Sequence, residues 1–223
     1  MPVAFDAQSS GGIGNSNTLT IAHTCSGTER VLLVGVEWNK ATSVPTTISS
    51  ITYNGIALTP GPSAKNANDE AAAIWYLINP ATGANSLIIT FSGNCAFQFG
   101  GLSYTGVNQT SPISQSSTAT GTSTTPSVAL TAVAGGYMAD SLNALGNLTL
   151  TPDASQTQRW NQNRAVGGSR FQGAASDKAN PGSYSMKWTA SSSSNWVIAA
   201  VALQPPAVTP TTGKFVPWIA VDL

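Results

Sequence analysis

The sequence predicts an all-β protein: an antiparallel two-sheet sandwich, jelly-roll-like, with an extended C-terminal tail. Three observations lead to this prediction. Short runs of β-branched and aromatic residues recur along the chain and are separated by Gly, Pro, Asn and Ser. No long window has the apolar period of about 3.6 residues that marks an amphipathic helix. The runs are more numerous than the seven strands of an immunoglobulin domain, so we favour a jelly roll over an immunoglobulin-like sandwich.

The first half of the chain contains the clearest strand signals. Residues 30–38 (RVLLVGVEW) are apolar at nearly every position, which predicts a strand buried on both faces. Asn54-Gly55 separates two β runs and predicts a tight hairpin. Gly100-Gly101 interrupts an aromatic run and suggests a β-bulge. The strands predicted in this half are 18–24, 30–38, 48–53, 56–59, 71–78, 86–91 and 95–104.

The second half repeats the pattern with weaker signals. The Ser/Thr-rich stretch 109–126 is predicted to be a loop, and the Gly/Asn/Ser-rich stretch 161–181 a long exposed loop. Because long ordered loops tend to be functional, the second stretch is a candidate contact surface. The strands predicted here are 127–133, 137–142, 156–160, 184–188 and 195–203.

After residue 204 the composition changes. We assign 1–204 to the sandwich domain, 205–213 to a Pro/Thr-rich extended linker and 214–223 to an apolar docking segment. An exposed apolar tail is a liability on a soluble protein, so we expect this segment to dock on its own domain or on a neighbouring subunit. The residues predicted to dock are Phe215, Val216, Trp218, Ile219, Val221 and Leu223.

The chain is poor in charge. Charged residues make up 8% of it, and nine Lys and Arg balance nine Asp and Glu. This composition argues against nucleic acid and against an anionic membrane surface as partners, since both are bound through clustered basic residues. A nearly uncharged surface suits a permanent assembly. We find no secretory signal and no apolar membrane span, so we expect export by lysis or by a route without a cleaved signal.

No residue set predicts catalysis, a metal or a cofactor, and we expect a protein that is not an enzyme. Cys25 and Cys95 are either buried free thiols or a disulfide, and the sequence leaves both alternatives open. His23 is the sole histidine and shares a strand face with Cys25, so it is read as a half-buried strand residue. Glu37 and Glu70 are the acids that could meet across strands, as glycoside hydrolysis would require.

The tryptophans offer an alternative function. Trp38, Trp75 and Trp196 lie in apolar runs and are expected in the core. Trp160 and Trp188 have polar neighbours, so they are the candidates for an exposed face that stacks on sugar rings. The alternative to a structural protein is therefore a non-catalytic carbohydrate-binding or adhesin module.

Four short motifs in a fixed order resemble a loosely defined group of β-sandwich proteins from tailed-phage particles and bacterial surfaces. The motifs are Tyr-Asn-Gly at 53–55, Trp-Tyr-Leu at 75–77, Tyr-Thr-Gly-Val-Asn-Gln at 104–109 and Val-Ala-Leu at 201–203. The resemblance spans about residues 5–205 and transfers no catalytic residue.

The resemblance implies a virion structural protein, such as a capsid decoration or fibre-like component, made in the host cytoplasm and exposed on the particle. Its expected partners are other virion proteins, such as capsid or tail, and sister copies of itself. A trimer is one candidate assembly, because such parts occupy symmetric positions. A host-surface glycan is a further candidate ligand. The tail 214–223 is not part of the resemblance.

Overall fold

A computed structural model describes residues 1–40, 46–166, 169–179 and 182–207. These residues form strands, turns and bends, and no helix occurs among them. Every strand pairing recorded for them is antiparallel. The predicted all-β, antiparallel class is therefore confirmed.

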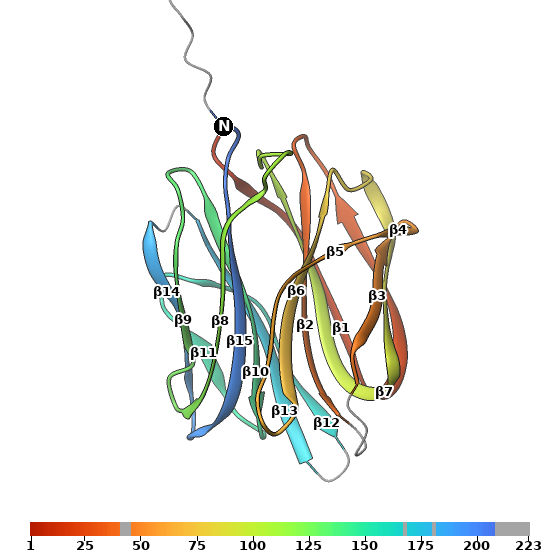
Figure 1. The fold of residues 1–223 in the computed structure, drawn as a ribbon, viewed down its shortest axis with the longest axis vertical. Coiled ribbons are helices and arrows are strands. Elements are labelled where there is room, and N and C mark those ends of the chain that lie inside the picture. The colour runs from red at the N-terminus through yellow and green to blue at the C-terminus, as the bar shows by residue number, and fades with distance from the viewer. Residues whose placement is uncertain (41–45, 167–168, 180–181, 208–223) are drawn as a thin grey trace, which may run out of the picture.

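The strands follow one another with short connections (Figure 1). They are β1 (Ala4–Cys25), β2 (Val31–Lys40), β3 (Ile48–Tyr53), β4 (Ile56–Ala57), β5 (Thr59–Lys65), β6 (Glu70–Ile78), β7 (Gly83–Thr105), β8 (Ile113–Ser123), β9 (Ser127–Thr131), β10 (Tyr137–Leu145), β11 (Leu150–Pro152), β12 (Thr157–Val166), β13 (Ser169–Ala179), β14 (Ser183–Ala190) and β15 (Ser194–Leu203).

The strands form three hydrogen-bonded sheets. A seven-stranded sheet has the order β4-β3-β7-β2-β6-β5, with β1 also paired to β7. A five-stranded sheet has the order β12-β13-β10-β15-β8, and a three-stranded sheet has the order β11-β14-β9. β1 and β7 are long enough to serve two layers: the ladder between them shifts register between Ile13 and Thr18, and His23, beyond the shift, lies against Gly101. The large sheet thus bends over itself.

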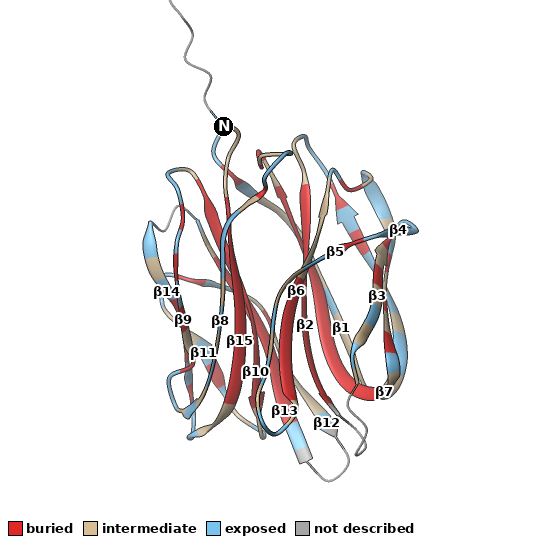
Figure 2. Cartoon of the chain, viewed as in Figure 1, coloured by how far each residue is buried: buried red, intermediate tan, exposed pale blue. Residues whose placement is uncertain are grey.

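Three hydrophobic cores separate the layers. Val31 and Leu33 of β2 face a central core shared with β10, β13 and β15. The alternate residues Leu32 and Val34 face an N-terminal core enclosed by the bent sheet. A C-terminal core lies between the five-stranded and three-stranded sheets. Successive strand residues point to opposite faces. The layer that contains β2 and β6 and the layer that contains β10 and β15 each lie between two cores, so both layers are buried on both faces. Figure 2 shows burial concentrated in these four strands.

The two halves of the chain repeat one topology. The order β1-β7-β2-β6-β5 in the first half recurs as β8-β15-β10-β13-β12, and β3-β7-β1 recurs as β11-β14-β9. Val31 of β2 pairs with Ile78 of β6 and Tyr104 of β7. Tyr137 of β10 pairs in the same way with β13 and β15. We call residues 1–107 the N-terminal unit and residues 108–207 the C-terminal unit.

The units pack reciprocally across the central core. Each contact between the units has an equivalent in the repeat. The contact of β5 with β8 corresponds to that of β12 with β1, and the contact of β6 with β15 corresponds to that of β13 with β7. The equivalent strands β2 and β10 contact each other. This is the pattern of an approximate two-fold axis between β2 and β10, as in an isologous dimer. The sequence predicted one two-sheet sandwich over 1–204, whereas the described residues contain two sandwiches stacked face to face.

Two local predictions have different outcomes. The Asn54-Gly55 hairpin is confirmed, with φ of 50° and 77° between β3 and β4. The prediction of a bulge at Gly100-Gly101 is wrong, because β7 pairs with β1 and β2 in continuous register there. These glycines instead make room for rings, since a Cβ on Gly100 would lie 2.7 Å from the Trp160 ring and one on Gly101 would lie 3.0 Å from His23.

Both predicted long loops contain strands. The stretch 109–126 includes β8, whose backbone pairs with β15 although its side chains are mostly Ser and Thr. The stretch 161–181 includes β13, whose residues 171–177 are buried, so it offers no exposed contact loop there. Small residues in β13 allow close packing: a Cβ on Gly173 would lie 2.7 Å from the Gln98 side chain and 3.1 Å from Glu37 Oε2. Because β13 has few large apolar residues, its sequence predicted a loop although it is a core strand.

Candidate functional site

The predicted docking segment falls on residues that the structure does not describe. Phe215, Val216, Trp218, Ile219, Val221 and Leu223 all lie beyond residue 207. Of the predicted linker 205–213, only 205–207 are described, and they continue directly from the end of β15. Docking of the tail therefore remains a prediction.

The two tryptophans predicted to touch a glycan are both in the core. Trp160 is 4% exposed in the central core, where Nε1 lies 3.3 Å from Glu37 Oε2. Trp188 is 1% exposed in the C-terminal core, where Nε1 donates to Asp140 Oδ2 at 2.9 Å. The prediction of a binding face at these residues is wrong. Neighbours on a strand point to the opposite face, so polar neighbours said nothing about the faces on which these rings lie.

The two cysteines are buried free thiols, so of the two alternatives the disulfide is not formed. In the ladder between β1 and β7, Cys25 pairs with Gly83 whereas Cys95 pairs with Ser16. Burial raises the pKa of both thiols, that of Cys95 to about 12. Because the thiolate is the nucleophile and the metal ligand, these thiols are poorly suited to either role.

His23 is almost fully buried and is hydrogen-bonded to Ser9 rather than to Cys25. Its Nδ1 lies 2.9 Å from Ser9 Oγ. Burial lowers the pKa of the imidazole to about 4 although Asp6 acts against it, so the ring is neutral at pH 7. The Asp6 carboxylate instead accepts from Ser26 N at 2.8 Å and Ser103 Oγ at 2.7 Å. Serine, histidine and aspartate are therefore neighbours here, but the aspartate does not orient the imidazole as a nucleophile set requires.

Glu37 and Glu70 do share one face of neighbouring strands. Glu37 pairs across the ladder with Ala72, so Glu70 is its diagonal neighbour, about 7–8 Å away. Glu37 is 0% exposed, accepts from Ser141 Oγ at 2.6 Å, and has a pKa raised well above its usual range by burial. Glu70 is 2% exposed and accepts from the Asn66 amide. Both carboxyls are buried: Glu37 links β2 to β10 through Ser141, whereas the partner of Glu70 lies in the turn between β5 and β6.

Two further buried acids were missed by sequence reasoning. Asp140 accepts from Ser176 N at 2.7 Å and from Trp188, and burial raises its pKa to about 7. Asp177 is 0% exposed, lies 2.8 Å from Arg159 Nε and accepts from the Tyr104 hydroxyl at 2.9 Å. An acidic residue inside an otherwise core-like strand was the available signal, because an acid is buried only when it is paired.

Replacing Asp140 with asparagine should flatten the pH dependence of stability. The folded-state pKa of Asp140 is raised, so its contribution is fully present below the unfolded value of about 4 and is lost as the pH rises through about 7. One titrating group gives a slope of at most about 1.4 kcal/mol per pH unit. Urea unfolding of both proteins between pH 4 and 8 should give a stability difference that narrows with rising pH. A difference independent of pH would show that Asp140 does not titrate in this range.

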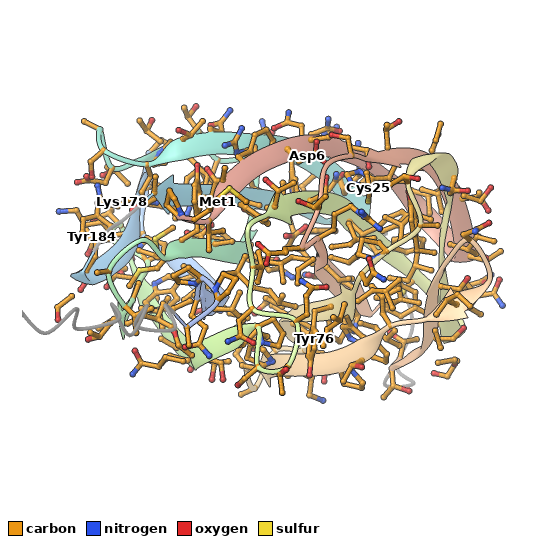
Figure 3. The ribbon with its side chains drawn as sticks, turned by 90° about the horizontal axis from the view of Figure 1, so that it is seen from above. Met1, Asp6, Cys25, Tyr76, Lys178 and Tyr184 are labelled. Carbon is orange, nitrogen blue, oxygen red and sulfur yellow. The ribbon has the colours of Figure 1, made fainter. Side chains whose placement is uncertain are left out.

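The surface offers shallow grooves and few charges. A groove of about 360 Å³ on β9 and β14 is lined by backbone and hydroxyl-bearing residues around Thr131 and Tyr184. Two more grooves, of about 430 and 380 Å³, flank Met1 and Pro2. In the end-on view of Figure 3, Met1 lies between Asp6 on one side and Lys178 and Tyr184 on the other. Lys178 Nζ lies 4.7 Å from the centre of the Tyr184 ring.

Comparison with family models, curated proteins and solved structures finds no match to the chain. Within the described ranges, no helix is long and apolar enough to cross a membrane. Nor do the described His, Cys, Asp and Glu residues include a group of three or more placed to hold a metal ion. The function of the chain is therefore inferred from its own surface and architecture.

Proposed function

We propose that this chain is a structural protein of a tailed-phage particle, a surface-exposed capsid decoration or fibre-like component without enzymatic activity. In this proposal it self-associates around a symmetry axis of the particle and anchors to other virion proteins such as capsid or tail. Support comes from the surface of the N-terminal unit and from the strand order of both units.

The observation that carries the proposal is a charge-free outer face on the N-terminal unit. On β1, β3 and β7, the residues that alternate with the core carry hydroxyl or apolar groups and no charge. They are Thr18, Thr20, Ala22, Thr24, Ser50, Thr52, Ser86, Ile88 and Thr90. Such a face lacks the repulsion that keeps free proteins apart and is compatible with permanent contacts.

The strand order supports the finer fold assignment. In the N-terminal unit, β1 and β7 each divide into two segments at the register shift. The first segment of β1 lies beside the last segment of β7, and the second segment of β1 lies beside the first segment of β7. The C-terminal unit has the same arrangement, with β8 beside β15 and β9 beside β14. We assign both units to the jelly-roll type, an architecture found in viral capsid and lectin domains. The carbohydrate-binding alternative is not carried further, because Trp160 and Trp188 are buried.

Deleting residues 214–223 tests the role of the apolar tail. We expect the full chain to form a defined oligomer and the truncated chain to be a folded monomer, because the deletion removes the apolar residues of the tail without touching the described strands. Light scattering gives the mass, and circular dichroism checks the fold. A full-length variant with Phe215, Trp218 and Ile219 replaced by serine is the matched control for chain length. A full chain that is monomeric would contradict self-association.

A further inference from the structure

Two of the three large exposed hydrophobic residues of the described part of the chain, Met1 and Val133, lie at or beside the two grooves at one end of the molecule. Met1, Ile56 and Val133 are the large hydrophobic residues that are exposed, at 77%, 59% and 44%. Ile56 is on β4, whereas Met1 lines both terminal grooves and Val133 adjoins Ala134, which lines one of them. This end also contains the N-terminus, marked in Figure 1.

The larger groove is apolar and has firm walls. It measures about 430 Å³ and is lined by Met1, Pro2, Ala134, Gly135, Pro205 and Pro206. No Asp, Glu, Lys or Arg side chain lines it. Its walls are tied together, because Val3 N donates to Gly135 O at 2.8 Å and Gln204 is bonded through its backbone to Asn108 and Pro112. A groove fixed in this way can accept a ligand with little reordering.

The chain itself supplies a segment with matching chemistry. From the groove wall at Pro205 and Pro206, the sequence continues through 207–213 to the apolar residues 214–223. Between Lys214 and Asp222 this segment carries no charged side chain, and no charged side chain lines the groove. Prolines 205, 206 and 210 restrict φ and favour an extended linker. Because the first residues of the linker form part of the groove, the tail of the same chain would have to reverse direction sharply to reach it. An extended linker opposes such a reversal. A neighbouring molecule requires no reversal.

We propose that residues 214–223 of a second copy of this chain occupy the apolar groove formed by Pro2, Ala134, Gly135, Pro205 and Pro206. This inference rests on the proposed self-association and names the surface that receives the tail. Tail and groove are different surfaces, so the contact is head-to-tail unless two chains exchange tails reciprocally. Repeated head-to-tail contacts build a ring or a filament, the kind of assembly that a fibre-like part needs.

Replacing Ala134 with aspartate tests the groove without touching the tail. Ala134 is exposed in the turn before β10, so the variant should fold, while the charge makes the groove unfavourable for an apolar segment. Asn94→Asp is the matched control, because Asn94 is exposed and separated from the groove end by the length of β7 between Asn94 and Thr105. Light scattering should show that Ala134→Asp is a monomer, as the tail-deleted chain is, and that Asn94→Asp forms the full oligomer.

Cysteine cross-linking identifies whose tail is bound. A chain carrying Ala134→Cys is mixed with one carrying Ile219→Cys; the native thiols, 1% and 0% exposed, stay out of reach. A disulfide between the two chains supports the proposal. The variant with both substitutions in one chain overturns it if it closes only within the monomer. Assembly that survives Ala134→Asp but fails without the tail also overturns the groove while leaving the proposed function intact. If every variant and the wild-type chain are monomers, both the groove proposal and the proposed self-association are contradicted.

Discussion

Replacing Trp160 with alanine should lower the free energy of unfolding by about 3–5 kcal/mol, as for other large-to-small substitutions of buried aromatic residues. The ring is 4% exposed and lies against Gly35 and Gly100, at the joint between the two units. Its removal leaves a cavity in the central core. It also takes a polar partner from the fully buried Glu37 carboxyl. Urea unfolding followed by circular dichroism measures the change.

Trp160→Phe is the matched control for this prediction. It keeps most of the ring volume and removes the indole N–H, so it should cost less than the alanine variant, on the order of 1–3 kcal/mol. The order of stability should therefore be wild type, phenylalanine, alanine. An alanine variant as stable as wild type would contradict the core position of Trp160 and revive the idea of an exposed sugar-binding face.

Much of the fold could be predicted because it depends on local patterns. Residues 30–38 were apolar at nearly every position, and β2 is indeed buried on both faces. Asn54-Gly55 could be placed in a hairpin because few other pairs tolerate two successive positive φ values. Patterns of this kind report which residues must be hidden from water, and they do so without knowledge of the partner strand.

The stacked pair of units could not be read from such patterns. The equivalent strands keep register but neither residue identity nor residue size: Gly100-Gly101 of β7 takes the place of Ala199-Ala200 of β15, and Trp38 of β2 takes the place of Ala144 of β10. A core needs its total volume filled and not a fixed side chain at each position, so the repeat is faint in the sequence. β8 and β13 were missed because most of their residues are small or polar, so the runs of large apolar residues that mark the other strands are absent from them.

The candidate site was the harder part to predict. Trp160 and Trp188 were assigned by their polar neighbours, and the two-residue period of a strand makes such neighbours uninformative. Asp140 and Asp177 were passed over because their partners lie on other strands, so their pairing is a product of the tertiary fold. The groove at Pro2 and Ala134 is likewise formed by segments far apart in the chain.

Replacing Arg159 with alanine is the second change with a large expected effect, about 3–5 kcal/mol of destabilisation at pH 7. Arg159 Nε lies 2.8 Å from Asp177 Oδ2, and its guanidinium carbon lies 3.4 Å from the centre of the Phe5 ring. The side chain therefore ties β12 and β13 of the C-terminal unit to β1 of the N-terminal unit. Without it, Asp177 keeps the Tyr104 hydroxyl as a donor but loses its cation while 0% exposed.

The pH dependence separates the lost ion pair from lost packing. Burial raises the pKa of Asp177, while Arg159 lowers it, so the variant should raise that pKa further. A raised folded-state pKa gives stability that is present at low pH and lost as the pH rises, so the gap from wild type should widen from pH 4 to pH 8. The double variant Arg159→Ala with Asp177→Asn should lose this widening. Lys178→Ala, which removes a partly exposed cation from the same strand as Asp177, should cost less than about 1 kcal/mol. A gap for Arg159→Ala that stays constant with pH would mean that Arg159 acts through its contact with Phe5 and not through its charge.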